Sequence, residues 1–425
     1  MPSSLPESLS QWLSFIEAAH PAEIELGLER SRLVADALQL RQGWNCPIVT
    51  LAGTNGKGST QAYISQIMAE HGYQVASYSS PHLLRYNERV CLNGVPTSDE
   101  QLCDAFAAVE QARHQLDVTL TYFEFGTLAA LWLFQQWQPD LVLLEVGLGG
   151  RLDSVNIIDP DISVITTVAL DHQGWLGNDR ESVGFEKAGI LREGVPFVYG
   201  ELDMPACVLA HAQSLNCPLY HWGDDFGPKG ESEGWSWFGV SAQGQSLDYG
   251  QLPLPELPFE NAATALQTIS LLPMNVNETA IRVGLKRAML AGRRQRLPLD
   301  GRELLLDVAH NPHAAAYLVR RLSPIAGKTW CVLGMLQDKD CSQTITALAP
   351  AVDEWLLADL SVPRGCHADQ LLSELPSGQQ ALCYHSPWVA CQAALEKSQP
   401  GDRILIVGSF FTVADILQSL QEQQG

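Results

Sequence analysis

The sequence predicts an α/β protein of two domains, the first with a phosphate-binding loop on a mostly parallel sheet and the second Rossmann-like. Its 425 residues exceed what one ordinary hydrophobic core holds. Short, nearly continuous apolar runs alternate with helical patterns, as in parallel sheets that helices cover on both faces. A glycine-rich loop also joins the first strand to a long helix. We expect the domains to span residues 1–296 and 297–425.

The first domain is expected to begin with two short helices and then to alternate strands with helices. Strands are predicted over 47–52, 74–78, 141–146 and 162–170. A first helix is predicted over 9–20, and a second follows the segment 23–30 and ends at about 40. Further helices are predicted over 59–71, 98–116 and 123–138, and one begins near 261. The tryptophan- and glycine-rich region 220–250 breaks this rhythm and indicates short antiparallel strands.

The alternation restarts beyond the segment A-G-R-R-Q-R at 291–296, which we interpret as a hinge. Strands are predicted over 303–308, 329–334, 355–358 and 403–407, and helices from 312, near 343, near 388 and from 412. This part is long enough for a doubly wound sheet of its own.

Composition excludes several classes of protein. A formal charge of −22 without clustered Lys or Arg argues against nucleic acid as a partner. Ten scattered cysteines without a C-x-x-C pair favour reduced thiols over disulfides or a zinc knuckle. The first ten residues lack the pattern of a leader peptide, and no apolar run reaches the ~18 residues of a membrane span. We therefore expect a cytoplasmic protein, and the acidic surface favours a monomer.

The stretch Val49 to Thr60 reads V-T-L-A-G-T-N-G-K-G-S-T and has the chemistry of an ATP site. Backbone N–H groups of a glycine turn and a helix N-terminus bind phosphate oxygens. The loop residues assigned to ATP are Thr54, Asn55, Gly56, Lys57, Gly58 and Ser59, with Lys57 on the β- and γ-phosphates. The Ser59 and Thr60 hydroxyls are assigned to a first magnesium ion. A glycine-rich match alone has a turn before a core helix as its alternative. The spacing differs from the usual Walker loop, with two residues instead of four between Gly53 and Gly56, and this makes the match more specific.

Four polar residues fall at or just beyond the carboxyl ends of predicted strands, where parallel sheets bind ligands: Ser80, Glu145, His172 and Lys187. Hydroxyl, carboxylate and a single imidazole suit magnesium or manganese better than zinc. Taken singly, Ser80 could be a helix cap, Glu145 a salt-bridge partner and His172 a core histidine. Lys187 could lie on the surface, since a protonated lysine would repel metal ions.

In the second domain, D-V-A-H-N-P-H places Asp307 and His310 where a strand gives way to a helix. We interpret both as nucleotide contacts. A zinc pair of His310 and His313 is disfavoured because Pro312 starts the helix between them and no third ligand is near. Arg293 is suited to a phosphate, although it could belong to a solvated basic turn.

Motifs along almost the whole chain resemble the folylpolyglutamate synthase family of the Mur ligase superfamily. They are, in order, G-T-N-G-K-G-S, Y-S-S-P-H-L, T-Y-F-E-F-G-T, E-V-G-L-G-G-R-L-D, A-L-D-H, E-K-A-G-I, A-G-R, D-V-A-H-N-P-H-A, L-G-M-L-Q-D-K-D and G-S-F-F-T-V-A. The segment L-G-L-E-R at 26–30, with T-Y-F-E and R-L-D, is similar to the bifunctional bacterial form. That form acts as dihydrofolate synthase and folylpolyglutamate synthase.

The resemblance implies a site for dihydropteroate or folate. Its residues would be Leu26, Gly27, Leu28, Glu29, Thr121, Tyr122, Phe123, Glu124, Leu152, Asp153 and Ser154. From the pattern alone, Gly27 marks either a close backbone approach or a plain helix junction.

The resemblance also implies an ATP-dependent amide ligase. A carboxylate of dihydropteroate or of a folate tail attacks the γ-phosphate, and the amine of L-glutamate displaces phosphate from the acyl phosphate. Lys57, Lys187 and His172 would be catalytic, with Lys187 carbamylated so that it becomes an anionic ligand of one of two Mg²⁺ ions. Asn261 would join Arg293 and Asp307 at ATP. Superfamily analogy assigns Lys339 and Ser409 to the incoming glutamate.

Alternative functions remain at this stage. The chain could be a monofunctional folylpolyglutamate synthase, a cell-wall Mur ligase, or, from another class, a switch that binds ATP without ligase activity. The basic run Arg294 to Arg296 could contact an anionic polyglutamate tail or lie exposed.

Overall fold

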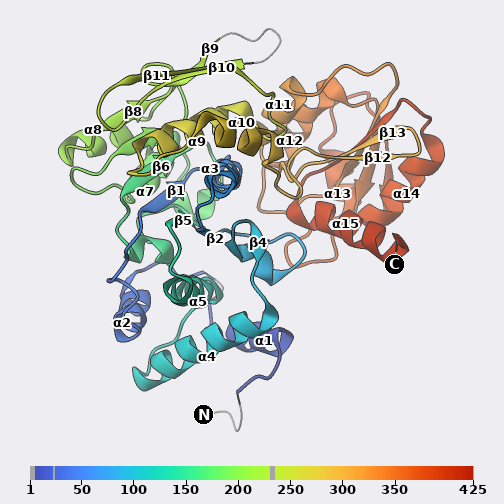
Figure 1. Ribbon diagram of the computed structural model, residues 1–425. Coiled ribbons are helices and arrows are strands. Elements are labelled where there is room, and N and C mark those ends of the chain that lie inside the picture. The colour runs from blue at the N-terminus through green and yellow to red at the C-terminus, as the bar shows by residue number, and fades with distance from the viewer. Residues whose placement is uncertain (1–4, 23, 230–234, 425) are drawn as a thin grey trace. The chain divides into compact units, whose positions relative to one another are not determined.

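Two compact units, Met1–Ala288 and Met289–Gly425, make up the chain in a computed structural model (Figure 1). The structure describes residues 5–22, 24–229 and 235–424. Each unit has its own sheet and its own helices, so the predicted α/β class is confirmed. No helix of the described ranges is long and apolar enough to cross a membrane.

The first unit is built on an eight-stranded sheet in the order β4-β3-β2-β5-β1-β6-β7-β8. The six strands β2, β5, β1, β6, β7 and β8 run parallel to one another. Strands β3 and β4 are added at the β2 edge, and each is antiparallel to its neighbour. The bounds are β1 Ile48–Ala52, β2 Val75–Tyr78, β3 Val90–Leu92, β4 Val95–Pro96, β5 Leu141–Glu145, β6 Ile162–Ile165, β7 Phe197–Tyr199 and β8 Leu219–His221. The sequence pattern missed β3, β4 and β7, since runs of two or three residues carry no periodicity.

Helices cover both faces of this sheet (Figure 1). On one face α3 (Lys57–His71) lies between the strands and the pair α9 (Phe259–Leu271) and α10 (Glu278–Arg287). On the other face lie α1 (Leu9–Ala18), α2 (Glu29–Ala37), α4 (Asp99–Gln115) and α5 (Tyr122–Trp137). The remaining helices are η1 Tyr86–Arg89, η2 Ser154–Ile157, α6 Gln173–Leu176, α7 Arg180–Ala188 and α8 Ala206–Ser214.

Side chains of alternate strand residues supply the two cores of this unit. Ile48 and Ala52 of β1 pack with the helices of the α1, α2, α4 and α5 face, whereas Val49 and Leu51 point to the opposite face. All four are buried, which is why the strand reads as a continuous apolar run.

A three-stranded antiparallel sheet follows in the order β11-β10-β9. Its strands are β9 Gly227–Lys229, β10 Trp235–Val240 and β11 Ser246–Leu252, which confirms the antiparallel strands predicted from the tryptophan- and glycine-rich region. Residues 230–234 of that region lie outside the described residues, as does Glu23 ahead of the L-G-L-E-R segment. The first predicted residues, 220 and 221, instead belong to β8 of the parallel sheet.

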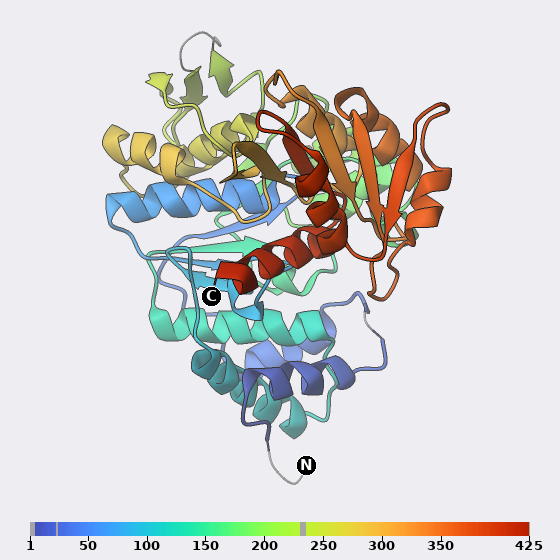
Figure 2. The same cartoon turned by 90° about the vertical axis from the view of Figure 1, so that its right-hand side faces the viewer.

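The second unit has a six-stranded sheet in the order β12-β13-β17-β14-β15-β16. Its strands, parallel except for β12, are β12 Gln295–Leu299, β13 Arg302–Leu306, β14 Thr329–Leu333, β15 Glu354–Ala358, β16 Ala381–Tyr384 and β17 Arg403–Val407. The helices are α11 Pro312–Arg320, α12 Cys341–Leu348, η3 Ala349–Ala351, α13 Ala368–Ser373, α14 Pro387–Lys397 and α15 Phe410–Gln424. Figure 2 shows α15 running beside these strands.

The segment predicted as a hinge is ordered within the second unit. Gln295 to Leu299 pair antiparallel with β13, and the Arg294 backbone N–H donates to Asp307 Oδ2 at 2.9 Å. The Val308 N–H donates to the Gly292 carbonyl in turn. The pattern missed β12 because Gln295, Arg296 and Pro298 leave no apolar run there, and proline in a sheet is confined largely to edge strands such as this one.

Replacement of Leu102 by alanine should destabilise the first unit. Its side chain is fully buried in α4, so we expect the free energy of unfolding to fall by about 2–5 kcal/mol from lost burial and a new cavity. Urea unfolding followed by tryptophan fluorescence measures this. The matched variant Leu254→Ala removes a side chain that is 71% exposed and should stay within about 0.5 kcal/mol of the parent. Equal losses in both variants would contradict the assignment of this core.

Candidate active site

The candidate site lies at the carboxyl edge of the parallel strands β2, β5, β1 and β6, which are neighbours in the sheet. Glu145 is the last residue of β5, the phosphate loop follows β1, and Ser80 comes two residues after β2. Strand register places Leu51 beside Glu145 and Ala52 beside Ile165. The sheet therefore brings these polar segments to one edge, as the sequence predicts.

The phosphate loop is tight enough to require glycine. Gly56 is the N-cap of α3 with φ 91°, a left-handed conformation. A Cβ there would lie 2.6 Å from Oδ1 of Asn261, on the neighbouring helix α9. Asn261 is thus packed directly against the loop, which agrees with its assignment to the same nucleotide site.

Residues after β6 hold the loop through hydrogen bonds. The Thr54 N–H donates to the Thr167 carbonyl at 2.9 Å, and the Asn55 N–H donates to Thr167 Oγ1 at 3.0 Å. Thr166 Oγ1 donates to the Asn55 carbonyl at 2.6 Å. The predicted strand 162–170 was therefore too long: β6 ends at Ile165 because the next residues pair with the phosphate loop.

Lys57 is the first residue of α3, two residues earlier than the predicted start of that helix. Its Nζ donates to the Gly53 carbonyl at 2.8 Å and lies 4.0 Å from Oε1 of the buried Glu145. A lysine at this helix N-terminus adds a full positive charge to the partial charge of the helix. The loop, the helix end and Lys57 together suit a polyphosphate.

Lys187 is buried in α7, which excludes the surface-lysine alternative. Burial, reinforced by the charge of Lys57, lowers its pKa to about 7, against the opposing attraction of Asp171 and Asp153. Burial likewise raises the pKa of Asp153 to about 6, although backbone N–H groups and Lys57 oppose the rise. These charges act on one another, so the four side chains share one electrostatic site.

His172 is not a core histidine. It caps α6 in a left-handed conformation with φ 50°, and its side chain is 39% exposed. Its backbone N–H donates to Asp171 Oδ1 at 2.8 Å. Its Nε2 lies 4.0 Å from Asp171 Oδ2, so the imidazole lies next to a carboxylate at the carboxyl edge of the sheet.

The donor set fits a hard divalent cation. Ser59, Thr60, Ser80 and Glu145 offer oxygen atoms and His172 one nitrogen, which suits Mg²⁺ or Mn²⁺. Thr60 Oγ1 is buried and has no hydrogen-bond partner among the described residues. The described ranges contain no group of three His, Cys, Asp or Glu able to hold a metal. Such a site suits an ion that takes few protein ligands and keeps bound water or phosphate oxygens.

Three segments assigned to the pteroate meet in the first unit. The Gly27 N–H donates to the Leu152 carbonyl at 3.3 Å, so Gly27 makes the close backbone approach that was one of its two readings. The Phe123 ring lies against Gly147, where a Cβ would be 2.5 Å from it. The Ser154 hydroxyl donates to Thr127 Oγ1 at 2.9 Å in α5.

Glu124 has internal partners beyond its assigned role. Its carboxylate accepts from the Thr121 N–H at 2.8 Å in a capping box of α5. It also forms an ion pair with Arg30 at 3.1 Å and accepts from the Ser31 hydroxyl at 3.3 Å. Glu124 thereby fixes the L-G-L-E-R segment against the start of α5.

In the second unit, Asp307, Arg293 and His310 gather beyond β13. Asp307 is buried, and burial raises its pKa although Arg293 opposes the rise. The Arg293 guanidinium lies 4.8 Å from the centre of the Phe410 ring. His310 Nδ1 is 2.9 Å from the Val308 carbonyl, and its ring is 6.3 Å from that of Phe410. Arg293 is therefore packed on an aromatic ring and not simply part of a solvated turn.

The two residues assigned to glutamate follow adjacent strands of this sheet. Lys339 lies in the turn after β14 and is half-buried, and Ser409 lies between β17 and α15 and is buried. Ser409 Oγ accepts from the Thr412 N–H at 3.0 Å. Their neighbouring positions are compatible with one ligand, and their role remains a prediction.

Comparison with known proteins identifies the family. Residues 292–410 match the family model described as Mur ligase, glutamate ligase domain. The chain is 43% identical over 419 residues to the dihydrofolate synthase/folylpolyglutamate synthase of Escherichia coli K12, covering 98% of this chain and 96% of the relative. The chain belongs to the folylpolyglutamate synthase family. The resemblance inferred from the motifs is thereby confirmed.

Solved structures of the folylpolyglutamate synthase family have the same fold over the whole chain. E. coli FolC, solved with DHPP and ADP, matches with a TM-score of 0.93 and 43% identity over 99% of both chains. The bifunctional enzyme of Yersinia pestis, solved with AMPPNP and a manganese ion, matches with a TM-score of 0.92 and 44% identity over 98% of this chain and 100% of that one. These are ligands of the relatives.

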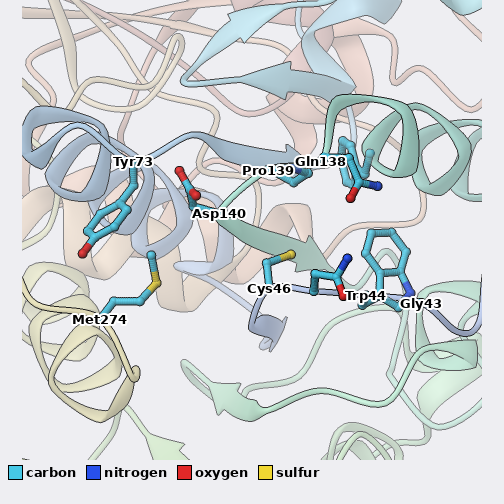
Figure 3. A pocket seen from close by; sticks show the side chains of 10 residues that line it. Gly43, Trp44, Cys46, Tyr73, Gln138, Pro139, Asp140 and Met274 are labelled. Carbon is cyan, nitrogen blue, oxygen red and sulfur yellow. The ribbon is translucent and has the colours of Figure 1, made fainter.

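A pocket of about 300 Å³ lies away from this site (Figure 3). Its wall includes Cys46, Tyr73 and Asp140, which precede β1, β2 and β5. It therefore opens at the amino edge of the sheet, opposite the phosphate loop. None of the residues predicted for the family's site lines it.

Sequence reasoning missed several residues that shape the site. The sequence pattern assigns no role to Asp171, and it places Thr166 and Thr167 within the predicted strand 162–170. Arg89 is buried, with its guanidinium 5.6 Å from the centre of the Tyr122 ring, and its Nε donates to His82 Nδ1 at 2.9 Å. The Y-S-S-P-H-L motif could have pointed to His82, but nothing in the pattern singles out Arg89.

Replacement of Gly56 by alanine should weaken ATP binding at least tenfold. The new Cβ collides with Asn261 and forces the loop out of its phosphate-binding shape. Titration calorimetry with a non-hydrolysable ATP analogue measures the affinity. Gly72 is a matched control: it caps the other end of α3 with φ 108°, and nothing lies within 4 Å of its Cβ position. Gly72→Ala should carry a similar backbone strain of about 1–3 kcal/mol but keep its affinity. An unchanged affinity in Gly56→Ala would contradict this site.

Proposed function

We propose that this chain is an ATP-dependent ligase that joins L-glutamate to dihydropteroate, giving dihydrofolate, and to the glutamate tail of reduced folates. The observation that carries the proposal is electrostatic. Asp153, in the segment assigned to the pteroate, is buried within the field of Lys57, in the segment assigned to ATP. A carboxylate substrate held by the first segment would therefore lie near a γ-phosphate held by the second.

The chemistry asked of the protein is mainly positioning and charge neutralisation. A carboxylate oxygen of the substrate attacks the γ-phosphorus, ADP leaves, and an acyl phosphate forms. The amine nitrogen of glutamate then attacks the acyl carbon, the C–O bond to phosphate breaks, and the nitrogen loses a proton. Lys57 offsets charge on the transferred group, and the backbone N–H groups of Gly56, Lys57 and Gly58 orient the phosphates.

Divalent metal fits the same proposal. Ser59 or Thr60, Ser80, Glu145 and His172 would hold two Mg²⁺ or Mn²⁺ ions, which when bound neutralise the phosphate oxygens. Lys187 would join them as a carbamate. Its burial and lowered pKa support this, because a neutral amine attacks CO₂ whereas an ammonium ion cannot.

The remaining assignments follow the same division of labour. Asn261, Arg293, Asp307 and His310 would contact the nucleotide. Lys339 and Ser409 would receive the glutamate carboxylates. In this view residues 1–296 carry the ATP and pteroate sites, and residues 297–425 form the glutamate-ligase domain. We further propose that the enzyme works in the cytoplasm as a monomer on small-molecule substrates.

The first test measures ADP release with ATP and magnesium. We expect release to require dihydropteroate and glutamate together, and to recur with tetrahydrofolate and glutamate. ADP release with tetrahydrofolate and glutamate, but not with dihydropteroate and glutamate, would show a monofunctional folylpolyglutamate synthase. ATP turnover independent of both acceptors would favour a switch, and absence of turnover with either would contradict the ligase.

Lys57→Ala should lower kcat/KM at least about a hundredfold, because it removes the cation at the transferred phosphate. The matched control Lys286→Ala removes an exposed lysine of α10 and should leave kcat/KM unchanged. Circular dichroism and thermal melting check that both variants fold. Equal activity in the two variants would remove Lys57 from the mechanism.

Carbamylation of Lys187 predicts a pH dependence. A pKa of about 7 leaves the amine mostly neutral above pH 7, whereas a lysine at the ordinary value of 10.5 stays protonated there. Carbamate formation should therefore rise with pH through neutrality, as measured by NMR with ¹³C-labelled bicarbonate. Lys187→Ala should lose the signal and most activity, and formate should restore part of that activity. The control Lys286→Ala should show the same ¹³C carbamate signal as the parent. A carbamate signal that persists in Lys187→Ala would contradict carbamylation of Lys187.

A further inference from the structure

All ten cysteines are free thiols, and two of them face one another in the second unit. The sulfur atoms of Cys341 and Cys366 are 3.9 Å apart. Cys341 is the first residue of α12, and Cys366 lies just before α13. They follow the adjacent parallel strands β14 and β15, so the sheet itself brings the two sulfurs together.

The loops that carry the two thiols are already joined by hydrogen bonds. The Cys366 N–H donates to the Met335 carbonyl at 2.9 Å, and the Gln337 N–H donates to the Arg364 carbonyl at 2.8 Å. Gln337 Nε2 also donates to the Gly365 carbonyl at 2.8 Å. A disulfide here would therefore link two segments that are held side by side before any bond forms.

The distance and exposure of the thiols suit oxidation. A disulfide has sulfur atoms about 2.05 Å apart, so the pair, now 3.9 Å apart, must close by roughly 2 Å for the bond to form. Cys341 is half-buried, whereas Cys366 is only 4% exposed. A small oxidant can reach such a pair more readily than a bulky disulfide can.

We infer that Cys341 and Cys366 form a reversible intrachain disulfide when the protein meets hydrogen peroxide. One thiolate attacks a peroxide oxygen, the O–O bond breaks, and a sulfenic acid and hydroxide form. The second thiolate then attacks the sulfenic sulfur, the S–O bond breaks, and hydroxide leaves as the S–S bond forms. The two thiols lose two protons and two electrons, peroxide is reduced to two waters, and an external dithiol reverses the change.

The contacts of the pair favour either thiol as the first nucleophile. Either sulfur of Cys341 and Cys366 can donate its S–H to the other, and the Cys341 S–H can instead donate to the Leu336 carbonyl at 3.7 Å. Whichever thiol ionises first therefore lies beside the other thiol, which stabilises the thiolate and then resolves the sulfenic acid.

The bond would affect the turn that carries Lys339. The Lys339 N–H donates to the Leu336 carbonyl at 3.2 Å, and the Cys341 N–H donates to the Lys339 carbonyl at 2.9 Å. Lys339 is thus two residues and one hydrogen bond from the new crosslink. If Lys339 binds glutamate, which rests on the proposed function, oxidation should change the KM for glutamate several-fold and leave the KM for ATP unchanged.

The test treats the full chain with hydrogen peroxide and counts thiols under denaturing conditions. We expect a loss of two of the ten thiols, one crosslinked peptide pair containing Cys341 and Cys366 by mass spectrometry, and full recovery with dithiothreitol. Cys341→Ser and Cys366→Ser should each abolish that peptide pair. The matched control Cys383→Ser removes an exposed thiol of β16 and should leave it unchanged.

Two results would overturn the inference. One is that both thiols stay reduced under conditions that oxidise the exposed Cys383. The other is that the crosslink joins two chains, which non-reducing electrophoresis detects. The peptide analysis needs no enzyme activity, so it decides the disulfide even if the ligase proposal fails. A disulfide without any change in the KM for glutamate would instead contradict the assignment of Lys339.

Discussion

The packing of the phosphate loop is the constraint on which the rest of the first unit depends. Gly56 adopts a left-handed conformation with φ 91°, which favours glycine, and Oδ1 of Asn261 lies 2.6 Å from where a Cβ would be. Thr166 and Thr167 bind the loop backbone from the other side, in place of extending β6. Helix α3, which starts at Lys57, lies between the sheet and the helices α9 and α10. The loop is therefore held by hydrogen bonds and packing within the protein, which is the preorganisation that phosphate chemistry needs.

Balance of buried charge is the second constraint. The side chains of Lys57 and Lys187 are largely shielded from water. The carboxylates of Glu145, Asp153 and Asp171 lie near enough to offset part of their positive charge. The offset is incomplete, since the pKa of Lys187 falls and that of Asp153 rises. The three carboxylates outnumber the two lysines, so a phosphate on the loop and a carbamate at Lys187 would add further negative charge. The proposed divalent cations would offset that charge.

The second unit uses the same architectural rule for different chemistry. Its polar residues also follow the carboxyl ends of parallel strands: Asp307 after β13, Ser409 after β17 and Lys339 after β14. The thiol pair belongs to the same edge, since Cys341 and Cys366 follow β14 and β15. Oxidation of this thiol pair would act on the turn that carries Lys339, although neither cysteine is among the residues assigned to a substrate. Placement at one sheet edge explains why a modification could be specific for one substrate.

The sequence alone determined the fold class, most long helices and strands, the phosphate loop and the family. These signals are local: a glycine turn before a helix, continuous apolar runs, and ordered motifs. It did not determine where β6 ends, that Gly27 approaches Leu152, that Lys187 is buried, or that Cys341 faces Cys366. Each of these joins residues distant in the chain or depends on how much water surrounds a group. Only tertiary packing brings such residues together and sets their pKa, because burial and neighbouring charge are properties of the folded molecule and not of a stretch of sequence.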